Sequence, residues 1–114
     1  MVKVVQTETL PGFSAGKLML KPFSGERLMI VRVEGPKGAL APRHAHPHEQ
    51  MTLILSGRVR FRIGEDQREL GPGEAIHIPS GIEHEAELLT DSVFIDIFHP
   101  VREDFLRKMV GTES

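Results

Sequence analysis

Three histidines are placed so that they could share one ion. His44 and His46 are two residues apart, and in an extended chain residues i and i+2 point to the same face. His84 lies in the segment 83–88, where three glutamates alternate with His84 and two apolar residues. The face without carboxylates should be buried, so the imidazole of His84 should point inward, where it needs a polar partner. A divalent metal bound by all three imidazoles would supply that partner.

Each of these signals is weak by itself. A buried histidine is more often a hydrogen-bonded core residue than a metal ligand, and a His-x-His pair also occurs on strands that bind no ion. The other three histidines, His48, His77 and His99, are not assigned to the metal.

The segments that must position these side chains are short and β-like. Apolar or alternating runs are separated by turns rich in glycine and proline, which is typical of a sandwich or barrel. Residues 101–110 differ, because they follow Pro100 and place Val101, Phe105 and Met109 on one helical face. They predict a short C-terminal helix packed against the strands. The predicted strands are 2–6, 17–21, 27–34, 50–56, 58–63, 75–78, 83–89 and 92–98.

The composition restricts the class of protein. A length of 114 residues fits one domain, and the absence of cysteine excludes disulfides and thiolate metal sites. The formal charge is −2, and there is no Tyr or Trp for base stacking, so a nucleic-acid partner is not expected. No apolar run is long enough for a signal peptide or for a membrane span of about 20 residues. We therefore expect a cytoplasmic protein without a membrane partner.

Two stretches resemble the two sequence motifs of the cupin family. Residues 38–57 contain a glycine, five residues, His-x-His and a closing glycine at the spacing of the first motif. Residues 73–88 contain the glycine, the Pro-x-Gly turn and the histidine of the second motif. The resemblance implies an all-β fold over residues 1–114, a single-domain cupin in which a double-stranded β-helix forms a jelly-roll barrel.

The same resemblance implies a set of metal ligands. Cupins bind a divalent ion with two histidines of the first motif, an acidic residue after them and the histidine of the second motif. By position these are His44, His46, Gln50 and His84. Gln50 thus replaces the acidic ligand, and strand alternation turns the neighbouring Glu49 outward if Gln50 faces in. Three imidazoles and an amide leave the charge of the ion uncompensated, so an anionic ligand should bind well. Zn, Ni, Co, Fe and Mn all suit these donors.

The C-terminal part of the sequence resembles one group of cupins more closely. Residues 96–105, DIFHPVREDF, and residues 46–50, HPHEQ, are similar to segments of cupins that ketonise 4,5-unsaturated uronates in pectin degradation. In that group an Asp, a Phe and an Arg of the tail line the active site, which here implies Asp96, Phe98 and Arg102. The resemblance implies a small anionic sugar acid as substrate, with its carboxylate on Arg102 and a proton shuttled by Asp96.

Two other functions stay open at this point. A metal-dependent dioxygenase would use a redox-active ion such as Fe or Mn, and a binding module would hold a small ligand without reaction. Asp96 could also pair with Arg102 in a purely structural ion pair that anchors the final helix.

An apolar stripe lies on the second face of the strand that carries Gln50. If Gln50 faces the pocket, Met51, Leu53 and Leu55 point outward. Such stripes are usually covered, either by a second subunit or by another part of the chain such as the C-terminal helix. We expect a C2-symmetric homodimer.

Overall fold

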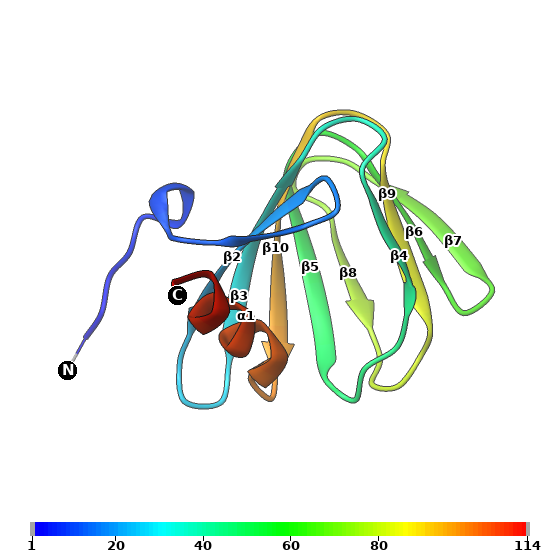
Figure 1. Ribbon diagram of the computed structural model, residues 1–114. Helices are drawn as coiled ribbons and strands as arrows, with labels where there is room; N and C mark the ends of the chain where they lie inside the picture. The colour runs from blue at the N-terminus through cyan, green and yellow to red at the C-terminus, as the bar shows by residue number, and fades with distance from the viewer. Residues whose placement is uncertain (1, 114) are drawn as a thin grey trace.

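Two antiparallel sheets face each other and form a jelly-roll barrel (Figure 1). The computed structural model describes residues 2–113, with side chains described as far as residue 110. The larger sheet has the order β1 (Phe13–Ala15), β2 (Leu18–Ser24), β3 (Met29–Gly35), β10 (Ser92–His99), β5 (Glu49–Ser56) and β8 (Ala75–Ile78). The smaller sheet has the order β4 (Leu40–His44), β9 (His84–Leu88), β6 (Val59–Ile63) and β7 (Asp66–Leu70). A 3-10 turn, η1 (Thr7–Thr9), precedes the strands and the helix α1 (Glu103–Glu113) follows them.

Side-chain alternation along the strands creates the core between the sheets. On β5, Gln50, Thr52 and Ile54 are buried, whereas the residues between them are exposed. The same period-two pattern buries His84 and Leu88 on β9. Because successive side chains of a strand point to opposite faces, one set of side chains lies in the core and the other set faces outward.

The strand predictions fail at the N-terminus and at three short strands. Residues 2–6 are not a strand: Val2 and Val4 are 88% and 89% exposed, and no described strand pairs with this segment. Strands β1, β4 and β7 were not predicted. In β7 only Leu70 is buried and the strand pairs only with β6 at the sheet edge, so its sequence carries no alternating pattern.

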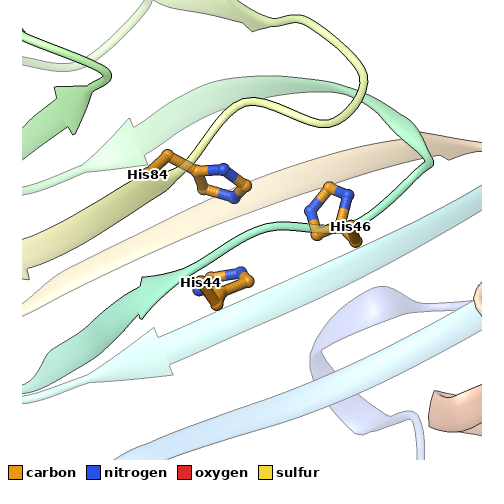
Figure 2. Close-up of side chains that lie close together, drawn as sticks. All are labelled: His44, His46 and His84. Carbon is orange, nitrogen blue, oxygen red and sulfur yellow. The ribbon is translucent and has the colours of Figure 1, made fainter.

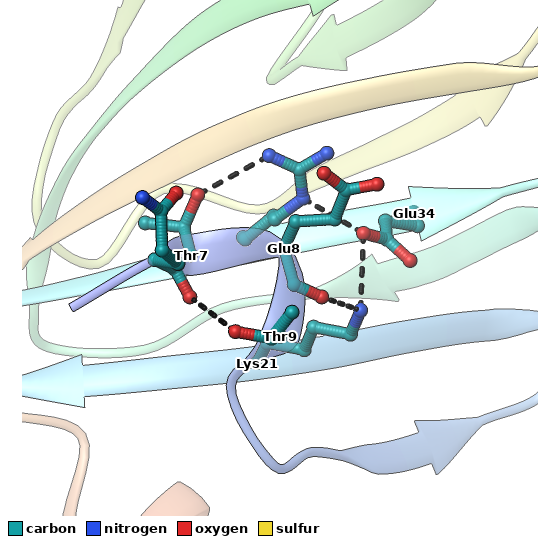
Figure 3. Close-up of polar contacts among 7 residues, drawn as sticks. Thr7, Glu8, Thr9, Lys21 and Glu34 are labelled. Atoms are coloured by element: carbon teal, nitrogen blue, oxygen red, sulfur yellow. Dashed lines mark hydrogen bonds and ion pairs between the residues drawn. The ribbon is translucent and has the colours of Figure 1, made fainter.

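A polar cluster holds η1 against the outer face of β2 and β3 (Figure 3). Lys21 donates to the main-chain carbonyl of Glu8 at 2.6 Å and pairs with Glu34 at 3.2 Å. Arg32 donates to Glu34 at 2.7 Å and to the Thr7 hydroxyl at 3.2 Å. The hydrogen bond from Arg32 is the main cause that lowers the pKa of Glu34. The cluster thus fixes η1 without burying any of its residues.

The predicted C-terminal helix is present, but it begins two residues later, at Glu103. The carbonyl of Arg102 accepts the main-chain N–H groups of Phe105 and Leu106, at 3.1 and 3.3 Å, so Arg102 precedes the first turn. The Phe105 ring packs against Phe13 of β1 and Phe98 of β10, with ring centroids 5.4 and 5.8 Å apart. No helix among the described residues has the length and apolar character needed to cross a membrane.

The apolar stripe on β5 is not covered by this helix. Met51, Leu53 and Leu55 are 51%, 37% and 44% exposed. The alternative that α1 covers the stripe is therefore wrong, because the helix packs at the β1 side of the barrel, away from β5 (Figure 1).

The alternation on β5 predicts unequal effects for truncations on the two faces of the strand. Ile54→Ala should lower the free energy of unfolding by about 3 kcal/mol, because it leaves a cavity at a fully buried side chain. Glu49→Ala should change it by only about 0.5 kcal/mol, because that side chain is exposed and its contact with His77 lies at the surface. Urea unfolding of the two variants measures both values, and equal losses would contradict the strand orientation.

Candidate metal centre

Two strands of the smaller sheet and a loop bring three histidines together (Figure 2). His44 is the last residue of β4 and lies opposite His84, the first residue of β9, in the strand register. His46 lies in the loop that connects β4 to β5, beyond the end of the strand. Each histidine offers one ring nitrogen, and these three nitrogens lie within 4.8 Å of one another. Loop and strand together bring about the convergence that the two-residue spacing suggested.

Hydrogen bonds to the main chain fix which nitrogen each ring offers. In every ring Nδ1 contacts a backbone carbonyl oxygen two residues away, and because a carbonyl only accepts, Nδ1 must carry the hydrogen. The carbonyls belong to Pro42, His48 and Ile82, at 2.7, 3.0 and 3.0 Å from His44, His46 and His84. In the neutral imidazole Nε2 is then a bare lone pair, which is the form that binds metals.

Gln50 adds a fourth acceptor to this group. Its Oε1 lies 3.1 Å from Nε2 of His46, while its Nε2 donates to the Thr52 hydroxyl at 3.1 Å. Two acceptors thus face each other across a hydrogen-bond distance with no hydrogen between them. Nε2 of His84 is buried and has no hydrogen-bond partner among the described residues. Glu49, the other candidate, faces outward and contacts His77 at 2.7 Å.

The rings of His46 and His84 carry no positive charge at neutral pH. Burial, with the charge of Arg102 and the neighbouring His84, lowers the pKa of His46 to about 4. Burial likewise lowers the pKa of His84. Since both rings are neutral at pH 7, converging lone pairs of nitrogen and oxygen are left for a cation to bind. The four residues present therefore fit a divalent metal with imidazole and oxygen donors.

A chain of hydrogen bonds through Thr52 links Gln50 to the carboxylate of Asp96. Asp96 lies on the inner face of β10 between Phe94 and Phe98, and its Oδ1 accepts the Thr52 hydroxyl at 2.6 Å. Burial raises the pKa of Asp96 to about 6, although hydrogen bonds from the Thr52 and Gln50 side chains and the charge of Arg102 lower it. A carboxyl group with this pKa can both hold and release a proton near neutral pH.

Arg102 pairs with Asp104 and makes no ion pair with Asp96. Its Nε and Nη2 donate to the two carboxylate oxygens of Asp104 at 3.0 and 2.8 Å, and this bond lowers the pKa of Asp104. The guanidinium also lies over the rings of Phe98 and Phe105, with Cζ 5.0 and 4.0 Å from their centroids. A structural ion pair between Asp96 and Arg102 is thus not what anchors the helix. Nη1 has no hydrogen bond to any residue that the structure describes.

A cavity of about 520 Å³ joins these groups. Its polar lining includes His44, Gln50, His84, Asp96 and Arg102, and Phe98 lines it too, whereas His46 is not among the lining residues. The rest of the lining is mostly apolar and comes from both sheets. The volume is in the usual range for small-molecule sites.

Two residues of this site were not given a role from the sequence. Thr52 shares the inward face of Gln50, so its parity on the strand was a usable signal. Asp104 had no such signal, because its contact with Arg102 depends on where α1 begins.

Comparisons with known proteins agree with this architecture. A family model described as "Cupin domain" matches residues 31–98. The pectin degradation protein KdgF of Dickeya dadantii is 36% identical over 81 residues, which are 69% of this chain and 74% of that protein. The dimethylsulfoniopropionate lyase DddQ of Ruegeria pomeroyi is 39% identical over 64 residues, 55% of this chain. That match spans only 32% of DddQ, so this chain corresponds to about a third of that relative.

Solved structures give the same result over nearly the whole chain. The structure of KdgF from Halomonas sp. has a TM-score of 0.84 and 27% identity, and the match covers 91% of this chain and 98% of that one. An RmlC-like cupin from Shewanella frigidimarina also has a TM-score of 0.84 and 27% identity, covering 92% and 96%. The two sheets, the two motifs and these similarities lead to one conclusion: the chain belongs to the cupin domain family.

Proposed function

We propose that this protein is a metal-dependent cupin enzyme that ketonises 4,5-unsaturated uronates, the sugar acids released by pectin or alginate breakdown. The observation that carries the proposal is the set of side chains that meet in one cavity. It combines the converging lone pairs of the metal centre, a carboxyl group with a raised pKa at Asp96 and unpaired guanidinium donors at Arg102. The similarity to two KdgF proteins supports the same substrate class.

The metal would be held by His44, His46, Gln50 and His84. When bound, a divalent ion polarises a substrate oxygen as a Lewis acid. All four ligands are neutral, so the protein leaves the charge of the ion to be balanced by an anionic substrate.

Arg102 supplies the second anchor for an anion. Asp104 occupies the Nε and Nη2 edge of the guanidinium, so Nη1 and the second hydrogen of Nη2 can bind a substrate carboxylate as a bidentate pair. The contacts of Arg102 with Phe98 and Phe105 restrict its motion, which lowers the entropic cost of binding. Phe98 also offers an apolar wall to the sugar ring.

Asp96 would move the proton. In the ketonisation the ring opens, the enol oxygen becomes a ketone and the neighbouring carbon gains a hydrogen, so a group must take up and return one proton. The burial that raises the pKa of Asp96 makes it suited to both steps.

The similarity to DddQ favours a second candidate, a lyase that acts on a small carboxylate. Such a reaction would use the same Arg102 anchor and Asp96 as base. Incubation of the protein with an unsaturated uronate and, separately, with dimethylsulfoniopropionate distinguishes the two candidates by which substrate is consumed.

The metal centre predicts a bound ion that depends on the histidines. Purified protein should contain one divalent metal per chain by elemental analysis, and His84→Ala and His44→Ala should lose most of it. Metal at about 100 times its Kd should stabilise the folded protein by about 2.7 kcal/mol, which thermal unfolding measures. His77→Ala is the control, because His77 lies outside the site. Metal-free wild-type protein that gains no stability from any of the candidate ions would contradict the centre.

Asp96→Asn should slow ketonisation by about 100-fold or more, because Asn cannot carry the proton. The decay of the ultraviolet absorbance of an unsaturated uronate measures the rate, and metal content should be unchanged. Asp66→Asn, the same substitution at the exposed start of β7, should react as wild type. An Asp96→Asn variant with full activity and full metal content would refute the role of Asp96.

We also propose that the stripe formed by Met51, Leu53 and Leu55 is the contact of a C2 homodimer. Ile95 and Ile97 of β10 lie beside the stripe in the strand register and are only half-buried, so the apolar surface continues across two strands.

Light scattering should therefore give twice the 12.7 kDa of one chain. Leu53→Lys should give a monomer, because it places a charge in the contact, whereas Gln67→Lys on the other sheet should stay dimeric. A wild-type mass of one chain would contradict the dimer.

A further inference from the structure

We propose that Thr52 sets which end of the Gln50 amide faces the metal, and is therefore a positioning residue for the ligand set. This inference rests on the metal centre proposed above. It concerns a residue that binds neither metal nor substrate in that proposal.

The position of Thr52 gives its hydroxyl two fixed neighbours. Thr52 is fully buried on β5, with Oγ1 2.6 Å from Asp96 Oδ1 and 3.1 Å from Gln50 Nε2. A hydroxyl has one hydrogen to donate and lone pairs to accept. Since its hydrogen goes to the carboxylate, Thr52 can meet Gln50 only as an acceptor, so the amide must turn its NH₂ toward Thr52.

This orientation decides whether Gln50 can be a ligand. The two ends of an amide differ chemically: the oxygen can bind a cation, and the NH₂ cannot. With the NH₂ held by Thr52, Oε1 points to the imidazoles, 3.1 Å from Nε2 of His46. With the amide reversed, the NH₂ would donate to Nε2 of His46 at that distance. That internal hydrogen bond would remove two ligand atoms at once, the oxygen of Gln50 and the nitrogen of His46.

The need for Thr52 is specific to glutamine at position 50. A glutamate there would present two equivalent oxygens, so either rotation of its carboxylate could bind the ion. The hydroxyl of Thr52 should thus matter for metal binding only when residue 50 is an amide. A residue that merely fills space in the core would matter equally in both cases.

Zn²⁺ affinity of four proteins tests this inference. We would compare wild type, Thr52→Val, Gln50→Glu and the double variant by calorimetric titration of the metal-free proteins at one pH. Thr52→Val removes the hydroxyl with little change in volume and should weaken Zn²⁺ binding by about tenfold or more, the usual size of an effect from a residue that orients a ligand. In the Gln50→Glu background the same change should alter affinity by no more than about threefold, since the orienting effect is absent.

Two further variants separate orientation from folding. Thr52→Ser keeps the hydroxyl and should bind Zn²⁺ as wild type does. Thr52→Ala also lacks the hydroxyl and should show the loss if Thr52→Val does not fold, as judged by thermal unfolding of the metal-free proteins.

Equal losses in the wild-type and Gln50→Glu backgrounds, or wild-type affinity in Thr52→Val, would overturn the role of Thr52 and leave the metal centre intact. Wild-type protein that binds none of Zn²⁺, Ni²⁺, Co²⁺, Fe²⁺ and Mn²⁺ would overturn both.

Discussion

The structure around the site depends on which groups accept the Nδ1 hydrogens of His44, His46 and His84. Each Nδ1–H is donated to a nearby backbone carbonyl, so three Nε2 lone pairs are left and the protein offers them no hydrogen. Burial of His46 and His84 opposes the charged form of their rings. Lone pairs that face one another in a poorly solvated space repel, and a bound cation relieves that repulsion. The barrel must therefore be stable enough to hold them in place, which the apolar core between the sheets provides.

The two charged residues of the cavity, Arg102 and Asp96, are stabilised in different ways. Arg102 is neutralised on one edge by Asp104 and held by two aromatic rings, so it can stay beside the neutral histidines without a second carboxylate. Asp96 is separated from the imidazoles by Thr52 and Gln50, which lie between them in the chain of hydrogen bonds. Asp96 accepts hydrogen bonds from Thr52 and Gln50 but is otherwise desolvated, so its pKa lies near neutral pH, where proton transfer is efficient.

The relatives place this chemistry within a family whose fold serves many reactions. One is named a pectin degradation protein and another a lyase of dimethylsulfoniopropionate, and the second matches over only a third of its length. Because fold alone does not determine function, the choice between such reactions depends on what lines the cavity. Here that lining combines the neutral side chains of His44, Gln50 and His84 with the guanidinium of Arg102, whose free edge suits a carboxylate.

The sequence by itself determined the inward face of β9, because the other face of segment 83–88 carries three glutamates. On β5 the period of two allowed either face to point inward, and the resemblance to the first family motif favoured the face of Gln50. The sequence thereby indicated that Gln50 and His84 point inward and Met51 outward, and the glycine and proline spacing identified the family. It did not determine β7, which is exposed on both faces except at its last residue, or the extended N-terminal segment, with which no described strand pairs. Only the tertiary structure decided that Arg102 pairs with Asp104 and that Thr52 links Gln50 to Asp96. These contacts depend on the start of a helix and on the register between β5 and β10, and local patterns in a sequence do not encode distances between strands.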